Sequence, residues 1–217
     1  ALQAKSRFAC LVAPFACLDG VNEKGVSCAV LTLDSKPTSR ITGKPVVSTP
    51  MAIRLVLDRA ATTQEAVDLL LSYDMFATSG RDYHFYITDA QGDGRVVEFD
   101  CDNPERLPVV TPTRQVTNFF VMHQDKVAPF QRNGAYGHGR ERYDAISAVL
   151  DKASAGEDAL VTAWKALRTA SQAPNPEDVT SNTQWSIVFD NRNLTADVAL
   201  RRRWDDVHHA DIHGNMV

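Results

Sequence analysis

Long apolar runs are missing from this sequence, and so is any excess of basic residues. No stretch approaches the roughly 18 consecutive apolar residues that a membrane-spanning helix needs. The 23 lysines and arginines are outnumbered by 27 acidic residues, which gives a formal net charge of −4. A nucleic-acid-binding surface needs a basic stripe to neutralise phosphates. We therefore expect neither a membrane nor a nucleic acid as a partner.

Cysteine is scarce, and its spacing matches no zinc motif. The four cysteines read as buried free thiols, which suits a reducing compartment and slightly favours the cytoplasm. A metal site has one candidate, His208–His209 with His213, because residues 209 and 213 would share one face of a helix. A solvated C-terminal tail is the alternative that we prefer, so no metal is predicted.

Familiar catalytic motifs are also absent: the sequence has no Gly-x-Ser-x-Gly, no phosphate-binding loop and no His-Glu-x-x-His. No cofactor is therefore expected. The chain opens with Ala-Leu-Gln-Ala-Lys-Ser-Arg, which is not a signal peptide. It also opens without a methionine, which leaves open the removal, processing or omission of residues upstream.

A charged turn followed by a buried strand is the clearest local pattern in the sequence. Asp19–Gly25 supplies two glycines for a tight reversal, and Val26–Leu33 then runs for eight residues without a charge. This length, with β-branched residues, predicts a buried strand. A content of 44% hydrophobic residues is ample for one packed domain over residues 1–217.

The other periodic segments predict helices and strands in separate clusters. Helices are expected behind Thr49 as N-cap with Pro50 at the first position, at the capping box Thr62–Glu65, and over Arg142–Lys152 and Glu157–Thr169. Strands are expected at Phe8–Ala13, Tyr83–Thr88, Arg95–Phe99, Pro108–Thr111, Gln115–Met122, Trp185–Phe189 and Leu194–Leu200, and loops at Asp34–Ser48, Asp74–Asp82 and Gln124–Gly139. Hairpin-joined strands beside clustered helices predict an α+β fold with antiparallel sheets.

Asn118 places a polar amide inside an otherwise apolar strand-like run. A buried amide without partners costs about 1–3 kcal/mol, so its hydrogen bonds must be satisfied. One interpretation is structural, with Asn118 capping a neighbouring strand or bulge. The other is functional, because a side-chain amide on a rigid strand can donate to the oxyanion of a tetrahedral intermediate.

Arg142 falls in the first turn of a predicted helix, where a positive charge opposes the helix dipole. A carboxylate ligand or a polarised thiol would compensate. A surface ion pair with Glu141 or Asp144 would do so equally well, and the sequence leaves both open.

Five segments together resemble the choloylglycine hydrolase family of linear amide C–N hydrolases, which are N-terminal-nucleophile hydrolases. They occur in the family's order across nearly the whole chain: Asp19-Gly-Val-Asn-Glu-Lys-Gly25, Tyr83-His-Phe-Tyr-Ile-Thr-Asp89 with Val96-Val-Glu98, Val116-Thr-Asn118, Glu141-Arg-Tyr143 and Thr183-Gln-Trp-Ser186. The resemblance implies a four-layer αββα sandwich and hydrolysis of a small-molecule N-acyl amide. The family includes bile salt hydrolases and penicillin V acylases.

The resemblance also implies roles for individual residues. It assigns the oxyanion-binding amide to Asn118, an arginine beside the thiol to Arg142, and a backbone oxyanion donor to Thr32. Leu18, Met75 and Phe76 fall where relatives line the acyl pocket, so an apolar acyl group is expected.

The family's nucleophile is an N-terminal cysteine whose α-amine acts as base, and none of the four cysteines matches its position. We therefore expect it upstream of residue 1 or on a separate N-terminal chain; a homo-oligomer is the other open partner prediction. Acyl transfer to an amine is a close variant of hydrolysis. The alternative from another class is a nucleophile-free protein that binds an acyl ligand.

Overall fold

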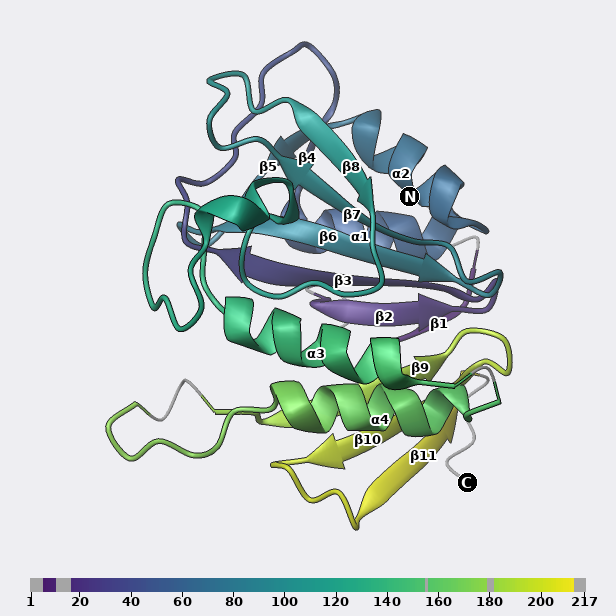
Figure 1. Ribbon diagram of the computed structural model, residues 1–217. Coiled ribbons are helices and arrows are strands. Elements are labelled where there is room, and N and C mark those ends of the chain that lie inside the picture. The colour runs from purple at the N-terminus through teal and green to yellow at the C-terminus, as the bar shows by residue number, and fades with distance from the viewer. Residues whose placement is uncertain (1–5, 11–16, 155, 179–181, 213–217) are drawn as a thin grey trace.

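The computed structural model describes residues 6–10, 17–154, 156–178 and 182–212. The strands are β1 Phe8–Ala9, β2 Asp19–Asn22, β3 Val26–Leu33, β4 Val46–Ser48, β5 Asp74–Phe76, β6 Asp82–Asp89, β7 Gly94–Phe99, β8 Pro108–Pro112, β9 Trp185–Asp190, β10 Thr195–Leu200 and β11 Val207–Asp211. The helices are α1 Thr49–Arg59, α2 Thr63–Leu71, the 3₁₀ helix η1 Val121–Lys126, α3 Arg140–Lys152 and α4 Ala159–Ala170. This α+β architecture is the predicted one (Figure 1).

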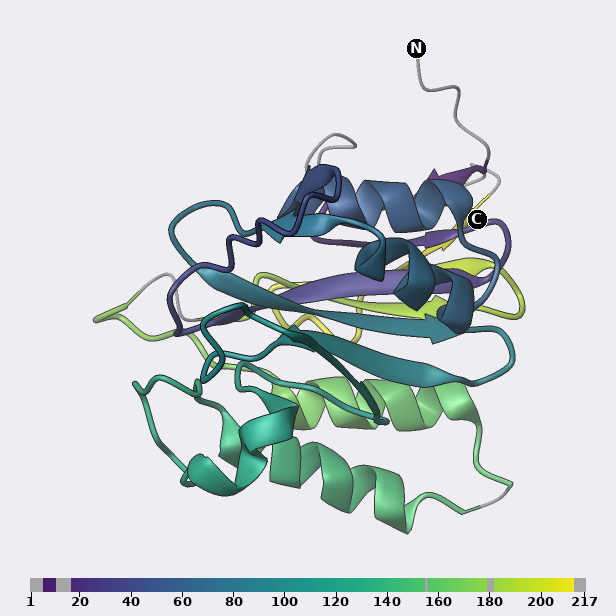
Figure 2. The ribbon, with the colours of Figure 1, turned by 90° about the horizontal axis from the view of Figure 1, so that it is seen from above.

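Two antiparallel sheets lie between two pairs of helices. The larger sheet has the strand order β1-β2-β3-β6-β7-β8, and the smaller has β11-β10-β9. Seen from above, α1 and α2 lie on one side of the strands, and α3 and α4 lie on the other (Figure 2). The predicted αββα arrangement with antiparallel sheets is confirmed.

The predicted turn at Asp19–Gly25 joins β2 to β3, and a buried asparagine holds it in place. Asn22 Oδ1 accepts hydrogen bonds from the backbone N–H groups of Lys24 and Val26, each at 3.0 Å. Its Nδ2 donates to the carbonyl oxygens of Leu57 and Ala60 at the end of α1. The same side chain therefore closes the turn and fixes α1 on the sheet.

The main hydrophobic core lies between the larger sheet and the helices α1 and α2. Ile53, Val56 and Leu57 of α1 and Leu70 of α2 are fully buried against it. The capping box of α2 forms as predicted at its N-cap, where Thr62 Oγ1 accepts from the N–H of Glu65 at 3.1 Å. These contacts fix the helix layer behind β3.

Two segments predicted to be loops each contain a short strand, so these two predictions are wrong in part. β4 falls within Asp34–Ser48 and β5 within Asp74–Asp82, and they pair in parallel through the crossover formed by α1 and α2. Strands of three residues are too short to show a hydrophobic period. The N-cap of α1 is Ser48 rather than Thr49, with the proline still in the first turn.

The predicted strand over Gln115–Met122 is wrong. Its only pairing among the described residues is a single bridge from Phe119 to Gly137, and residues from Val121 onward form η1. The buried carboxylate of Glu98 explains the change, because its oxygens accept the N–H groups of Val121 and Met122 at 2.7 and 2.9 Å. A contact with β7 thus overrides the local apolar pattern.

Both ends of the chain also differ from expectation. Of the predicted strand Phe8–Ala13, residues 8–9 form β1 and residues 11–13 lie outside the described residues. The expected polar tail contains the edge strand β11, on which His208 and His209 lie; His213 is outside the described residues. Among the residues that the structure describes, no helix has the length and apolar character needed to cross a membrane.

Candidate active site

Thr32, Asn118 and Arg142 are joined by a chain of hydrogen bonds. Arg142 Nη2 donates to Asn118 Oδ1 at 2.9 Å, and Asn118 Nδ2 donates to the carbonyl oxygen of Thr32 at 3.0 Å. The three residues come from the end of β3, the segment before η1 and the first turn of α3. The structure therefore brings together the three predicted catalytic residues.

The bond from Arg142 sets the orientation of the Asn118 amide. A guanidinium can only donate, so the acceptor that faces it is the amide oxygen, and the NH₂ group must face β3. That NH₂ group carries two hydrogens, of which one points to the carbonyl of Thr32. The second hydrogen can reach another acceptor at the same place.

The backbone of Thr32 turns toward this site and away from β6. The N–H of Val30 donates to the carbonyl of Leu18 at 2.9 Å, on the β2 side of β3. The backbone groups of residues two apart in a strand point to the same side, so the N–H of Thr32 points to this side too. The predicted donor and the observed acceptor of Thr32 thus lie on one edge, the edge that Asn118 contacts.

A glycine-dependent clamp holds the segment that carries Asn118. The N–H of His138 donates to the carbonyl of Asn118 at 2.8 Å, and the N–H of Phe120 donates to the carbonyl of Tyr136 at 3.0 Å. Gly137, between them, has a φ of +103°, and a Cβ there would lie 2.5 Å from the Cα of Phe119. Only glycine allows this approach, so the sequence of the loop fixes the position of Asn118.

Arg142 lies in the first turn of α3, where it donates to Asn118 and has the Glu141 carboxylate nearby. Burial lowers the pKa of the Arg142 guanidinium, while the nearby Glu141 carboxylate acts to raise it. The ion pair with Asp144 that the sequence left open belongs to Arg140 instead, at 2.8 Å. Arg142 is therefore committed to the site and not to the helix surface.

A histidine–aspartate pair next to this chain was not predicted. His138 Nδ1 and a carboxylate oxygen of Asp34 lie 2.7 Å apart, and Arg81 approaches the other oxygen at 3.9 Å. Asp34 follows Thr32 by two residues and His138 follows Asn118 by twenty. The pair forms a second link beside the Thr32–Asn118 bond, and its separation of 104 residues left no local signal.

The three predicted acyl-pocket residues lie in different environments. Leu18 and Phe76 are 42% and 48% exposed, whereas Met75 is 1% exposed and belongs to the core under α1. Among the described residues, no hydrogen bond or ion pair links these three side chains to Thr32, Asn118 or Arg142. Their role in an acyl pocket stays a prediction.

A mainly apolar cavity of about 430 Å³ is lined by residues that neighbour Thr32 and Asn118 in the sequence. Two of its lining residues are Leu31, which precedes Thr32 in the sequence, and Val116, which lies two residues before Asn118. The other walls come from β6, β9, α3 and α4. Thr32, Asn118 and Arg142 are not among its lining residues, so the cavity is related to the site only through these sequence neighbours.

The described cysteines are free thiols, as predicted, but only Cys17 and Cys28 are fully buried; Cys10 and Cys101 are partly exposed. Burial raises the pKa of Cys17 to about 12 and that of Cys101 to about 11, and it also raises the pKa of Cys28. Thiols with raised pKa values are protonated at neutral pH and react poorly as nucleophiles. These three residues are therefore unsuited to the nucleophile's role.

The comparison with protein families gives a direct assignment. The family model described as acyl-coenzyme A:6-aminopenicillanic acid acyl-transferase matches residues 8–204. The chain belongs to this family. The match runs from β1 to the residues after β10 and so includes Thr32, Asn118 and Arg142. A search of the curated proteins finds no significant match.

Solved structures show the same fold. A variant of conjugated bile acid hydrolase from Clostridium perfringens superposes with a TM-score of 0.70 at 15% identity, over 91% of this chain and 73% of that chain. A second mutant of the same hydrolase gives 0.69 at 16% identity with the same coverage. Penicillin V acylase from Agrobacterium tumefaciens gives 0.65 at 19% identity, over 94% of this chain and 74% of that one. These structures share the predicted N-terminal-nucleophile hydrolase fold, and together with the family match they support the resemblance drawn from the sequence.

Proposed function

We propose that this chain supplies the oxyanion-binding site of an enzyme that hydrolyses a linear amide bond in an N-acyl substrate. The observation that carries this proposal is the hydrogen-bond chain from Arg142 through Asn118 to Thr32. It gives a partly buried guanidinium, an oriented amide donor and a strand edge with a backbone N–H at one place. The amide and the backbone N–H are the donors that a tetrahedral intermediate needs for its negative charge, and the guanidinium orients the amide.

The nucleophile in this proposal is an N-terminal cysteine located upstream of Ala1 or on a separate chain. Its thiolate attacks the amide carbonyl while its own α-amine takes the thiol proton. Asn118 Nδ2–H and the N–H of Thr32 donate to the resulting oxyanion. Collapse of the intermediate breaks the C–N bond, the leaving amine takes the proton, and water then releases the acid from the thioester.

The substrate in this proposal carries an apolar acyl group. The cavity lined by Leu31 and Val116 supports this choice, because it is mainly apolar and these two residues lie close in sequence to Thr32 and Asn118. The structural neighbours act on penicillin V and on conjugated bile acids, according to their names. Both compounds are therefore suitable first probes.

Acyl transfer is a second candidate, and the family assignment favours it. The same thioester intermediate reacts with an amine instead of water, so the residues of this chain would have the same roles. Product analysis with 6-aminopenicillanic acid as a competing amine separates the two. An amide product that rises with amine concentration identifies transfer, and free acid alone identifies hydrolysis.

The test of the proposed function uses the protein with its N-terminal segment or partner chain in place. Incubation with penicillin V and with a glycine-conjugated bile acid should release the free amine, and alkylation of the N-terminal thiol should stop it. Intact mass should show one acyl adduct on that cysteine during turnover. Tight acyl-ligand binding without adduct or product would instead identify a nucleophile-free binding protein and refute the proposal.

A further inference from the structure

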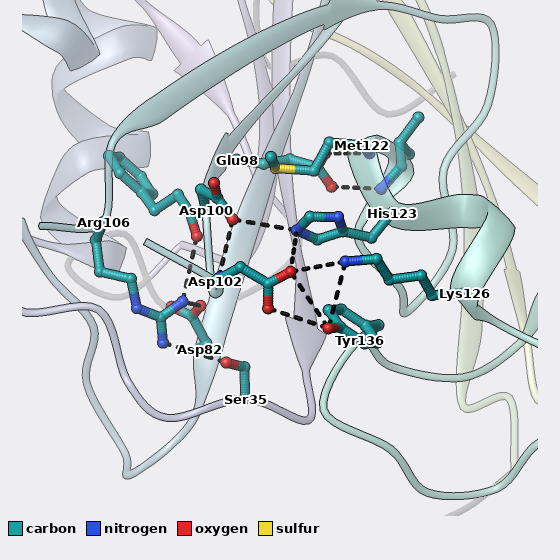
Figure 3. Close-up of polar contacts among 12 residues, drawn as sticks. Ser35, Asp82, Glu98, Asp100, Asp102, Arg106, Met122, His123, Lys126 and Tyr136 are labelled. Carbon is teal, nitrogen blue, oxygen red and sulfur yellow. Dashed lines mark hydrogen bonds and ion pairs between the residues drawn. The ribbon is translucent and has the colours of Figure 1, made fainter. Parts of the chain in front are cut away.

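The turn after β7 and the helix η1 bring three kinds of metal-binding side chain together. Donor atoms of Asp100, Cys101 and His123 all lie within 4.8 Å of one another. His123 Nε2 is 3.1 Å from Asp100 Oδ1 and 3.7 Å from Asp102 Oδ2 (Figure 3). An imidazole, a thiol and one carboxylate thus lie close together, and a second carboxylate lies near the imidazole.

The spacing fits a tetrahedral ion with little movement. Zinc binds nitrogen and oxygen at about 2.0–2.2 Å and sulfur at about 2.3 Å, so tetrahedral donors lie about 3.3–3.6 Å apart. The Asp100–His123 separation is already close to this value. The thiol would move inward by about 1.5 Å at most to complete the set.

The donor types select the class of metal. Calcium and magnesium take oxygen ligands, whereas thiolate and imidazole together suit zinc and similar transition ions. The Cys101 thiol also lines a cavity of about 600 Å³ with Asp102 and Arg106, so an ion has a route from solvent. The site differs from the one at Thr32, Asn118 and Arg142, and no step of the proposed reaction uses it.

Two basic side chains, Lys126 and Arg106, lie near this cluster, and their positive charges disfavour a bound cation. Lys126 Nζ donates to Asp102 Oδ2 at 2.7 Å and also to the hydroxyl of Tyr136 at 3.4 Å (Figure 3). Arg106 is engaged with Asp82 at 3.2 Å. Asp102 is therefore already neutralised by Lys126, whereas Asp100 has no cation nearer than the imidazole among the contacts that the structure describes.

We infer that Asp100, Cys101 and His123 form a binding site for a divalent zinc-like ion, with water or Asp102 in the fourth position. On binding, the S–H bond of Cys101 breaks as the sulfur–metal bond forms, and the proton passes to solvent. His123 binds through Nε2 in its neutral form. The ion would join the β7–β8 turn to η1, whose first N–H groups are held by Glu98.

Cobalt titration of the reduced, metal-free 217-residue chain tests this site. Co²⁺ should bind once per chain with thiolate-to-metal absorption in the near ultraviolet, and Zn²⁺ should remove that absorption. Because the metal binds the thiolate, binding at pH 7 should release about one proton per ion. Cys101→Ser should abolish both signals.

Matched variants show whether the signals belong to this site. His123→Gln removes a direct metal ligand. It should therefore weaken Co²⁺ binding by more than the roughly 10–100-fold cost of losing a residue that only hydrogen-bonds to a ligand. Cys10→Ser and His208→Gln remove a thiol and an imidazole elsewhere and should bind as the wild type does. Circular dichroism of each variant checks folding. Absence of thiolate absorption in excess Co²⁺, or absorption that persists in Cys101→Ser, overturns the inference.

Discussion

Asn118 illustrates how a single residue can satisfy a structural and a functional interpretation at once. Its amide bonds to Arg142 and to the carbonyl of Thr32, which meets the structural need of a partly buried polar group. The same bonds aim its NH₂ group at the edge of β3. The sequence could place the polar residue but could not show which partners orient it, because Thr32 is 86 residues away.

Arg142 should act by holding Asn118 and not by touching the reacting atoms. We expect Arg142→Lys to lower kcat by about tenfold to 10²-fold, less than the 10²–10³-fold cost of losing an oxyanion donor outright. The reason is that an ammonium lacks the directed fork of a guanidinium. Steady-state kinetics of the complete protein checks this, and a rise in KM with unchanged kcat would show that Arg142 only binds substrate.

The Asp34–His138 pair should contribute to the stability of the site region. Both side chains are about a quarter to a third exposed, so we expect a coupling of about 0.5–1 kcal/mol. A double-mutant cycle of Asp34→Asn and His138→Gln, measured by urea unfolding, gives this value. Strictly additive effects of the two substitutions would mean that the 2.7 Å contact contributes nothing.

Among the elements, the loop before α3 has the most demanding geometry. Gly137→Ala adds a Cβ in a left-handed backbone conformation and against the backbone of Phe119. We expect a loss of about 2–4 kcal/mol of unfolding free energy, combining backbone strain with overpacking. Urea unfolding measures it.

A matched control separates the two contributions. Gly92 also has a positive φ, +88°, but nothing lies within 4 Å of an added Cβ. Gly92→Ala should therefore cost only the backbone part, about 1–2 kcal/mol. Equal losses in the two variants would show that the close approach at Phe119 is not important.

The prediction of secondary structure succeeded for a long apolar run and failed where contacts between distant residues decide the structure. The eight-residue run Val26–Leu33 is β3 to the residue. The run over Gln115–Met122 is apolar enough for a strand, but Glu98 on β7 accepts its N–H groups and turns its end into η1. β4 and β5 were missed because three-residue strands carry no measurable period.

For the whole molecule, buried aspartates predict how stability depends on pH. Burial acts to raise the pKa of Asp74, but hydrogen bonds from the N–H and hydroxyl of Thr42 and the N–H of Lys44 outweigh it and lower the pKa. A lowered folded-state pKa stabilises the protein above the unfolded value of about 3.9. That contribution is lost as the pH falls through the lower folded value.

Asp74→Asn should therefore make the acid side of the stability curve shallower. The comparison is the free energy of unfolding in urea between about pH 5 and pH 2, for wild type and variant. Asp68→Asn is the control, because its carboxylate accepts only a side-chain bond from Gln64 among the described contacts. Parallel curves for wild type and Asp74→Asn would contradict the role of the Thr42–Lys44 bonds.

The α+β class with antiparallel sheets was accessible from the order of elements, because clustered helices beside hairpins predict it without any knowledge of pairing. The four-layer αββα arrangement and the family came from the resemblance carried by residues scattered along the chain. Asn118 and Arg142 stood out in the sequence with two interpretations each, whereas Thr32 and the catalytic roles of all three came only from the resemblance to a family. The Asp34–His138 pair and the Asp100–Cys101–His123 cluster needed coordinates, because each joins side chains from separate elements.

The most direct measurement is kcat of Asn118→Ala in the complete protein, with its N-terminal segment or partner chain present. An oxyanion donor acts in the transition state, so kcat should fall by roughly 10²–10³ while KM changes little. Asn193→Ala, in the β9–β10 turn, is the matched control and should turn over normally. Turnover of Asn118→Ala equal to that of the wild type would contradict the assignment of the oxyanion-binding site.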